Sequence, residues 1–184
     1  MTSSIPHWKW ISFAILALSA VWIALSTSLI PLPSPATISA PQIGLLAPPI
    51  DLSSLQDKQY DLAQVKGKVV LVNFFASWCP PCKAEMPAMQ KAYSAYPSTG
   101  LQIYAITNLQ QDNLPELQNF IDSSGAHFPI LLDQDGAVFR EYAIRALPTT
   151  FLIDSTGHIQ KIFYGGPLTE GLLATEIDRL IKGR

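Results

Sequence analysis

Two cysteines that stand three positions apart have the clearest capacity for chemistry in this chain. Cys79 and Cys82 are the only cysteines among its 184 residues, and they lie in the run Trp78-Cys79-Pro80-Pro81-Cys82. A disulfide between them closes so small a loop that it removes little entropy from the unfolded chain. Such a bond would stabilise the fold only weakly, which disfavours a purely structural disulfide. Two cysteines also supply only half of a four-ligand zinc site. The spacing therefore favours a dithiol that cycles with a disulfide, and no metal or separate cofactor is expected.

The local sequence predicts different properties for the two thiols. The apolar run over residues 68–75 predicts a buried strand, and the chain turns helical directly after the cysteines. Cys79 then lies at a helix N-terminus, where unpaired N–H groups and the helix dipole favour a thiolate. Cys82 lies one turn further in and should be more buried. We therefore expect Cys79 to attack a substrate disulfide and Cys82 to resolve the mixed disulfide.

The elements that must position this pair follow from hydrophobic periodicity. Apolar, β-branched runs predict strands, and they lie over residues 68–75, 101–107, 128–132, 149–153 and 159–164. Helical spacing predicts helices after the cysteines and over residues 114–124, 137–142 and 169–181, the last with Thr169 as N-cap. Turns are expected at residues 56–59, between two short extended pieces, and at residues 154–157. Strand–helix alternation followed by a hairpin and a helix predicts an α/β fold with a mixed sheet.

The first 49 residues have a different character from the rest. Residues 11–30 carry no charge and match the length of about 20 residues that a bilayer core requires. A retained transmembrane anchor is predicted, with a cleaved signal peptide as the alternative. Lys9 precedes this segment and Lys58 is the next lysine, which directs the C-terminal domain out of the cytoplasm. Six prolines between residues 31 and 49 predict an extended tether. The expected division is a cytoplasmic end (1–10), an anchor (11–30), a tether (31–49) and a domain (50–184).

The charge distribution excludes one class of partner. The formal net charge is −2, and the 12 lysines and arginines are scattered without a basic stripe. Nucleic-acid binding is therefore disfavoured.

Several sequence blocks in order resemble the thioredoxin superfamily. They resemble in particular the membrane-tethered extracytoplasmic branch that includes the ResA, TlpA and CcmG proteins. The blocks are KGKVVLVNFFASWCPPCKAEMP, FPILLD, and LPTTFLID with the following GHIQK, and the likeness runs from about Ile50 to the C-terminus. It implies a thioredoxin-like three-layer fold and a monomeric protein-disulfide oxidoreductase. The implied role is that of a periplasmic reductant, for example of apocytochrome c during cytochrome c maturation, recharged by a membrane electron donor.

The resemblance also assigns roles to residues around the cysteines. Trp78 resembles the aromatic residue that shields the pair, and Pro80 and Pro81 would lie with it against the substrate. Pro148 resembles the cis-proline that faces the disulfide. The backbone of Leu147 is then free to pair with a substrate strand.

Three further residues complete the predicted site. Pro87 resembles the proline that kinks the active-site helix. Thioredoxins carry a buried aspartate six residues before the first cysteine, but this chain has Asn73 there, which cannot titrate and is expected to be structural. Glu85 is then the better proton acceptor for Cys82, because three residues along a helix bring it to the same face. Partial burial would raise its pKa toward the useful range, and the alternative is a solvated helix carboxylate.

Two other function classes stay open at this point. A copper-binding or copper-chaperone module of the same fold would use two cysteines and a histidine, and copper titration with and without the cysteines discriminates it. A thiol peroxidase would need a lone reactive cysteine, and a peroxide-consumption assay discriminates that reading.

Overall fold

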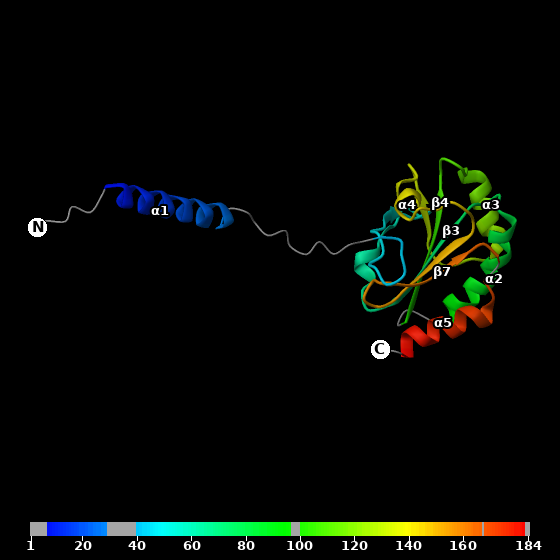
Figure 1. Ribbon diagram of the computed structural model, residues 1–184. Coiled ribbons are helices and arrows are strands. Elements are labelled where there is room, and N and C mark those ends of the chain that lie inside the picture. The colour runs from blue at the N-terminus through cyan, green and yellow to red at the C-terminus, as the bar shows by residue number, and fades with distance from the viewer. Residues whose placement is uncertain (1–6, 29–39, 97–99, 167, 183–184) are drawn as a thin grey trace, which may run out of the picture. The chain divides into compact units, whose positions relative to one another are not determined.

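The computed structural model describes residues 7–28, 40–96, 100–166 and 168–182. The chain divides into two compact units, Met1–Thr37 and Ile38–Arg184. In the first unit, α1 spans His7–Ser28 (Figure 1). The sequence predicts a transmembrane anchor over residues 11–30, of which 29 and 30 lie outside the described residues. Within the described ranges, no helix has the combined length and apolar character that a membrane span requires.

A five-stranded mixed sheet forms the centre of the second unit. Its strands are β3 (Val69–Phe75), β4 (Leu101–Asn108), β5 (Ile130–Asp133), β6 (Thr149–Ile153) and β7 (Ile159–Tyr164). Their spatial order is β5-β4-β3-β6-β7. β3 pairs in parallel with β4 and antiparallel with β6, while β4 and β5 are parallel and β6 and β7 antiparallel. The predicted α/β fold with a mixed sheet is confirmed.

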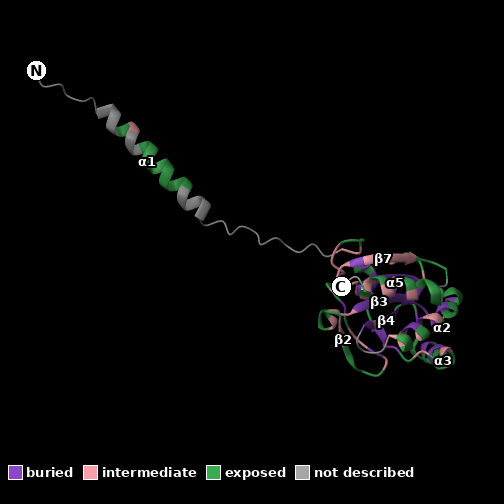
Figure 2. Cartoon of the chain, turned by 90° about the horizontal axis from the view of Figure 1, so that it is seen from below, coloured by how far each residue is buried: buried purple, intermediate pink, exposed green. Residues whose placement is uncertain are grey.

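Helices cover both faces of this sheet, and the alternation of side chains along β3 explains why. Leu71 and Phe75 pack in one core with α2 (Pro80–Ala95), α3 (Leu114–Ser124) and α5 (Glu170–Lys182). Val72 and Phe74 point the opposite way and pack in a second core with α4 (Ala137–Glu141). Successive side chains in a strand point to opposite faces, so a fully apolar strand needs cover on both. The layers are visible in Figure 1, and Figure 2 shows the buried character of β3 and β4.

The N-terminal part of this unit adds smaller elements. The two short extended pieces pair as β1 (Asp51–Ser53) and β2 (Gln59–Asp61), with the predicted turn between them. A 3₁₀ helix, η1 (Leu62–Val65), follows, and the sequence analysis did not predict it. At the other end of the unit, Thr169 caps α5 as predicted, because its hydroxyl accepts a hydrogen bond from Leu172 N at 3.3 Å.

The packed unit begins earlier than the sequence boundary at residue 50. Gly44 N donates to Ile159 O at 2.8 Å, and Ile159 N donates to Leu45 O at 2.9 Å. Ala47 N donates to Gly157 O at 2.9 Å. The latter part of the segment predicted as a tether over residues 31–49 therefore pairs its backbone with the first residue of β7 and with the turn before it. Residues 31–39 lie outside the described residues.

Candidate active site

The two cysteines form a disulfide at the start of α2. Their Sγ atoms are 2.06 Å apart and their Cα atoms 5.3 Å apart. Cys79 is the N-cap residue of α2, and Cys82 N donates a hydrogen bond to Cys79 Sγ at 3.3 Å. Cys79 retains 4% of its surface exposed, while Cys82 has none. The predicted order of burial is confirmed, and Cys79 is the sulfur that a substrate can reach.

The helix start and its interior proline follow from the sequence around the pair. Pro80 and Pro81 occupy the first positions of α2, where a missing N–H costs least. Pro87 lies inside the same helix. A proline there cannot donate to the carbonyl four residues earlier and its ring crowds that carbonyl. The structure thus places Pro87 inside α2, and the kink itself stays a prediction.

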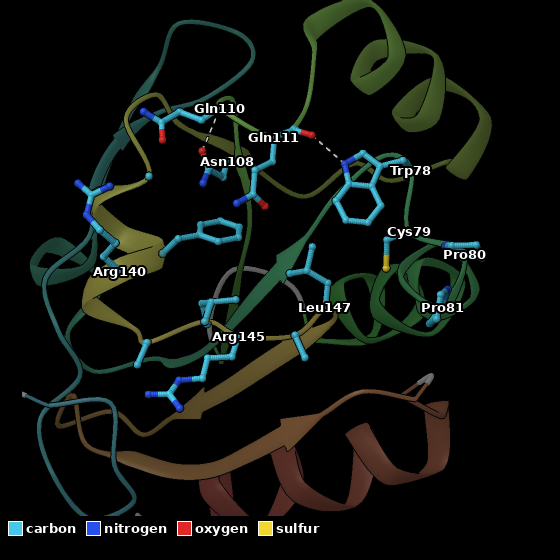
Figure 3. Close-up of a pocket in the computed structure, with 15 residues that line it drawn as sticks. Trp78, Cys79, Pro80, Pro81, Asn108, Gln110, Gln111, Arg140, Arg145 and Leu147 are labelled. Carbon is cyan, nitrogen blue, oxygen red and sulfur yellow. Dashed lines mark hydrogen bonds between the residues drawn. The ribbon is translucent and has the colours of Figure 1, made fainter.

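A cleft of about 830 Å³ opens beside Cys79 (Figure 3). Five of the six residues predicted to contact substrate or flank the reacting sulfur line it, namely Trp78, Cys79, Pro80, Pro81 and Leu147. The sixth, Pro148, is buried and follows Leu147 through a cis peptide bond, as the resemblance implies. The cleft therefore brings together two segments of the predicted site, residues 78–81 and Leu147, which lie almost 70 positions apart in the chain.

Trp78 is the most exposed aromatic residue on the wall of this cleft. More than half of its surface, 56%, is accessible to solvent. Its indole Nε1 donates a hydrogen bond to Gln111 O at 2.8 Å, as Figure 3 shows. This contact holds the ring beside Cys79, and the sequence analysis missed Gln111 because a backbone acceptor leaves no signal in residue types.

Behind the disulfide, Glu85 is fully buried on α2. Its Oε1 accepts a hydrogen bond from Asn73 Nδ2 at 2.6 Å, and the same Nδ2 donates to Thr150 Oγ1 at 2.9 Å. Asn73 faces α2 because it lies two residues from Leu71 along β3, on the same face of the sheet. Burial raises the pKa of Glu85 to about 7, against the opposing hydrogen bonds from Asn73 and the backbone of Leu168. The carboxyl group can therefore exchange a proton near neutral pH.

A second carboxylate, that of Asp112, holds the chain segment that leads into the cysteines. It is buried and accepts four hydrogen bonds. Ser77 donates both its N–H, at 2.7 Å, and its hydroxyl, at 2.5 Å. Thr107 Oγ1 and Asn113 N supply the other two, each at 2.9 Å. The sequence analysis missed this residue, because an aspartate before a helix looks like ordinary capping chemistry.

The described residues include no group of three or more His, Cys, Asp or Glu side chains arranged to hold a metal ion.

Comparisons with known proteins agree with the fold and with the dithiol. Residues 43–162 match the model of the AhpC/TSA family. The chain is 41% identical over 133 residues to the thiol-disulfide oxidoreductase ResA of Halalkalibacterium halodurans, covering 71% of this chain and 72% of that protein. It is 38% identical over 127 residues to ResA of Bacillus subtilis, covering 69% of each.

Solved structures give the same result. StoA from Bacillus subtilis superposes with a TM-score of 0.61 at 30% identity, covering 70% of this chain and 95% of that chain. A thiol:disulfide interchange protein of the thioredoxin family from Chlorobium tepidum gives 0.67 at 27% identity, covering 74% and 95%. The likeness therefore spans the sheet, its helices and the segment that carries the two cysteines.

Proposed function

The chain belongs to the AhpC/TSA family and is a thiol–disulfide oxidoreductase with a thioredoxin-like fold, and we propose that it reduces disulfides of exported proteins outside the cytoplasm. The observation that carries the proposal is the position of Cys79. Its sulfur caps the N-terminus of α2, and Cys79 lines an open cleft. Cys82 lies one helical turn further along α2 and has no exposed surface. Apocytochrome c cysteines are the substrate class that the family resemblance favours.

The proposed reaction passes two electrons from the protein dithiol to a substrate disulfide. In the reduced protein, the Cys79 thiolate attacks one substrate sulfur, breaks the substrate S–S bond and forms a mixed disulfide. The released substrate sulfur takes up a proton. Cys82 then loses its proton, attacks Cys79 Sγ and releases the second substrate thiol. The protein ends as the Cys79–Cys82 disulfide, the state that the structure contains, and a membrane electron donor is proposed to reduce it again.

Each residue that flanks the cysteines has a proposed role in these reaction steps. The helix N-terminus stabilises the Cys79 thiolate through the helix dipole and through the Cys82 N–H, which donates to Cys79 Sγ at 3.3 Å. Glu85 lies one helical turn beyond Cys82, and its raised pKa suits it to accept the proton that Cys82 must lose. Trp78 and Leu147 line the two sides of the cleft and would hold the substrate segment against Cys79.

The location outside the cytoplasm rests on sequence. Residues 11–30 are uncharged, and the nearest flanking lysine, Lys9, precedes them. The anchor remains a prediction, and fractionation of the full-length protein tests it. Retention in the membrane fraction after an alkaline wash is expected, and release into the supernatant would contradict the anchor.

Insulin disulfide reduction tests the proposed function. Cys79→Ser should abolish it, and Cys82→Ser should accumulate mixed disulfides that are visible without reductant on a gel. Unchanged activity in both variants would remove the pair from the reaction. The direction of electron flow follows from the reduction potential of the pair. A value near about −270 mV supports a reductant, and one near about −120 mV reverses the assignment.

A further inference from the structure

The wall of the cleft opposite Cys79 carries two positive charges. Arg140 lies in the last turn of α4, and Arg145 lies in the loop that leads to β6. Both are exposed, and both line the cleft. Figure 3 shows them across the hollow from Cys79, with Leu147 between. The fifteen residues that line the cleft include these two cations and no aspartate or glutamate.

Within the described residues, neither arginine forms an ion pair with a carboxylate. The four ion pairs of the described residues lie elsewhere, on α2, β7 and α5. Arg140 Nη1 donates to the backbone oxygen of Asp135 at 2.7 Å, a contact that orients the guanidinium without cancelling its charge. The Asp135 carboxylate instead accepts a hydrogen bond from Ala137 N. Glu141 follows Arg140 on α4 but does not line the cleft.

The rest of that wall is polar and uncharged. Asn108, Gln110 and Gln111 contribute amide groups that can both donate and accept hydrogen bonds. A chain segment that binds there meets net positive charge, so an acidic segment gains attraction and a basic one is repelled.

Building on the proposed function, we propose that Arg140 and Arg145 select protein substrates with acidic residues close to the target cysteine. The occupant is an extended segment of the substrate protein whose cysteine sulfur reaches Cys79 while its carboxylates reach the arginines. Because both arginines are exposed, each should contribute a modest preference of about two- to fivefold. The preference should weaken as salt screens the charges.

Matched disulfide peptides test this preference with the full-length protein. Three peptides would share one sequence and differ only in carrying Glu, Gln or Lys at the positions around the cysteine. We expect kcat/KM to fall in the order Glu, Gln, Lys at low salt, and the differences to shrink in about 0.5 M salt. Arg140→Gln and Arg145→Gln should each lower the Glu/Gln ratio by about two- to fivefold, and the double variant should bring it close to 1.

Two controls separate a charge effect from damage to the cleft. Arg140→Lys and Arg145→Lys keep the charge and should keep most of the preference. Arg179→Gln removes a cation from α5, outside the cleft, and should leave the ratio unchanged.

Two results would overturn the inference. One is a wild-type protein that reduces the Glu and Gln peptides equally well, and the other is a double variant that keeps the wild-type ratio. In either case continued reduction of the Gln peptide would leave the proposed function intact. Failure to reduce any of the three peptides would count against the proposed function itself.

Discussion

Two buried carboxyl groups flank the active-site cysteines, and they are held in opposite ways. Asp112 receives four hydrogen bonds, from Ser77, Thr107 and Asn113, so its oxygens are surrounded by donors. Glu85 is at least as deeply buried but has one side-chain donor, Asn73 Nδ2, which it shares with Thr150. Burial therefore dominates at Glu85 and raises its pKa to about 7.

This difference separates two requirements of a dithiol site. The segment before Cys79 must be held still so that the sulfur meets the cleft, and a carboxylate saturated with donors does that. A proton must leave Cys82 near neutral pH, and a carboxyl group poorly supplied with donors can take it. Asp112 thus fixes the backbone on one side of the pair, while on the other side Glu85 has the raised pKa that the proposed proton transfer requires.

The largest expected effect is a loss of stability when the carboxylate of Asp112 is removed. Asp112→Ala leaves four donors without their acceptor, and unmade buried hydrogen bonds cost about 1–3 kcal/mol each. Water reaches the half-exposed Ser77, so we expect a total loss of about 3–4 kcal/mol in the free energy of unfolding. Denaturant unfolding of the oxidised protein measures it. Asp122→Ala, an exposed position on α3, is the matched control, and a similar loss in both variants would refute the anchoring role.

The second prediction concerns the titrating carboxyl group. Its pKa is raised in the folded state, so the folded protein keeps a proton that the unfolded chain releases above pH 4.5. Stability contributed by Glu85 is therefore lost as pH rises from about 4.5 to 7, by up to about 3 kcal/mol. Glu85→Gln cannot titrate, and its stability relative to wild type should increase over that pH window.

Urea unfolding of both oxidised proteins at several pH values measures this difference. The control is Gln118→Ala, which changes an exposed, uncharged residue of α3. Its stability should change with pH in the same way as that of wild type. A constant difference between Glu85→Gln and wild type across the window would show that Glu85 does not titrate there. The same variant should shift the pH dependence of Cys82 thiol reactivity, and an unchanged profile would remove Glu85 from the proposed proton transfer.

The smallest effect on free energy is expected at Trp78, which lies on the same side of the cysteine pair as Asp112. Trp78→Phe keeps an aromatic ring but loses the hydrogen bond to Gln111 O, at a cost of about 0.5–1 kcal/mol. We expect a rise of KM for a peptide disulfide with little change in kcat. Tyr164→Phe, an exposed residue of β7, is the control. A fall in kcat with KM unchanged would indicate that the ring acts on the chemistry and not on substrate placement.

Local patterns in the sequence were sufficient for much of this site. Apolar runs identify β3 and β4, and the residues after the cysteines mark the start of α2, so the position of Cys79 as its N-cap follows from neighbours in the chain. The face shared by Cys82 and Glu85 follows from helical spacing alone. These features depend on residues only a few positions apart, which is the range over which periodicity and capping carry information.

Other features depend on contacts that no local pattern encodes. Ser77 meets Asp112 across 35 positions, and Asn73 meets Thr150 across 77. The pairing of residues 44–47 with residues 157 and 159 likewise joins distant segments and begins the domain before residue 50.

The sequence by itself determined which two cysteines form the disulfide, and which of them is the N-cap of α2. Only the tertiary structure decided that Glu85 is fully buried with few donors while Asp112 is saturated with them. The physical reason is that burial and hydrogen-bond supply are properties of the packed neighbourhood, which distant segments build together. Periodicity can place a carboxylate on a helix face, but it cannot count the donors that will surround it.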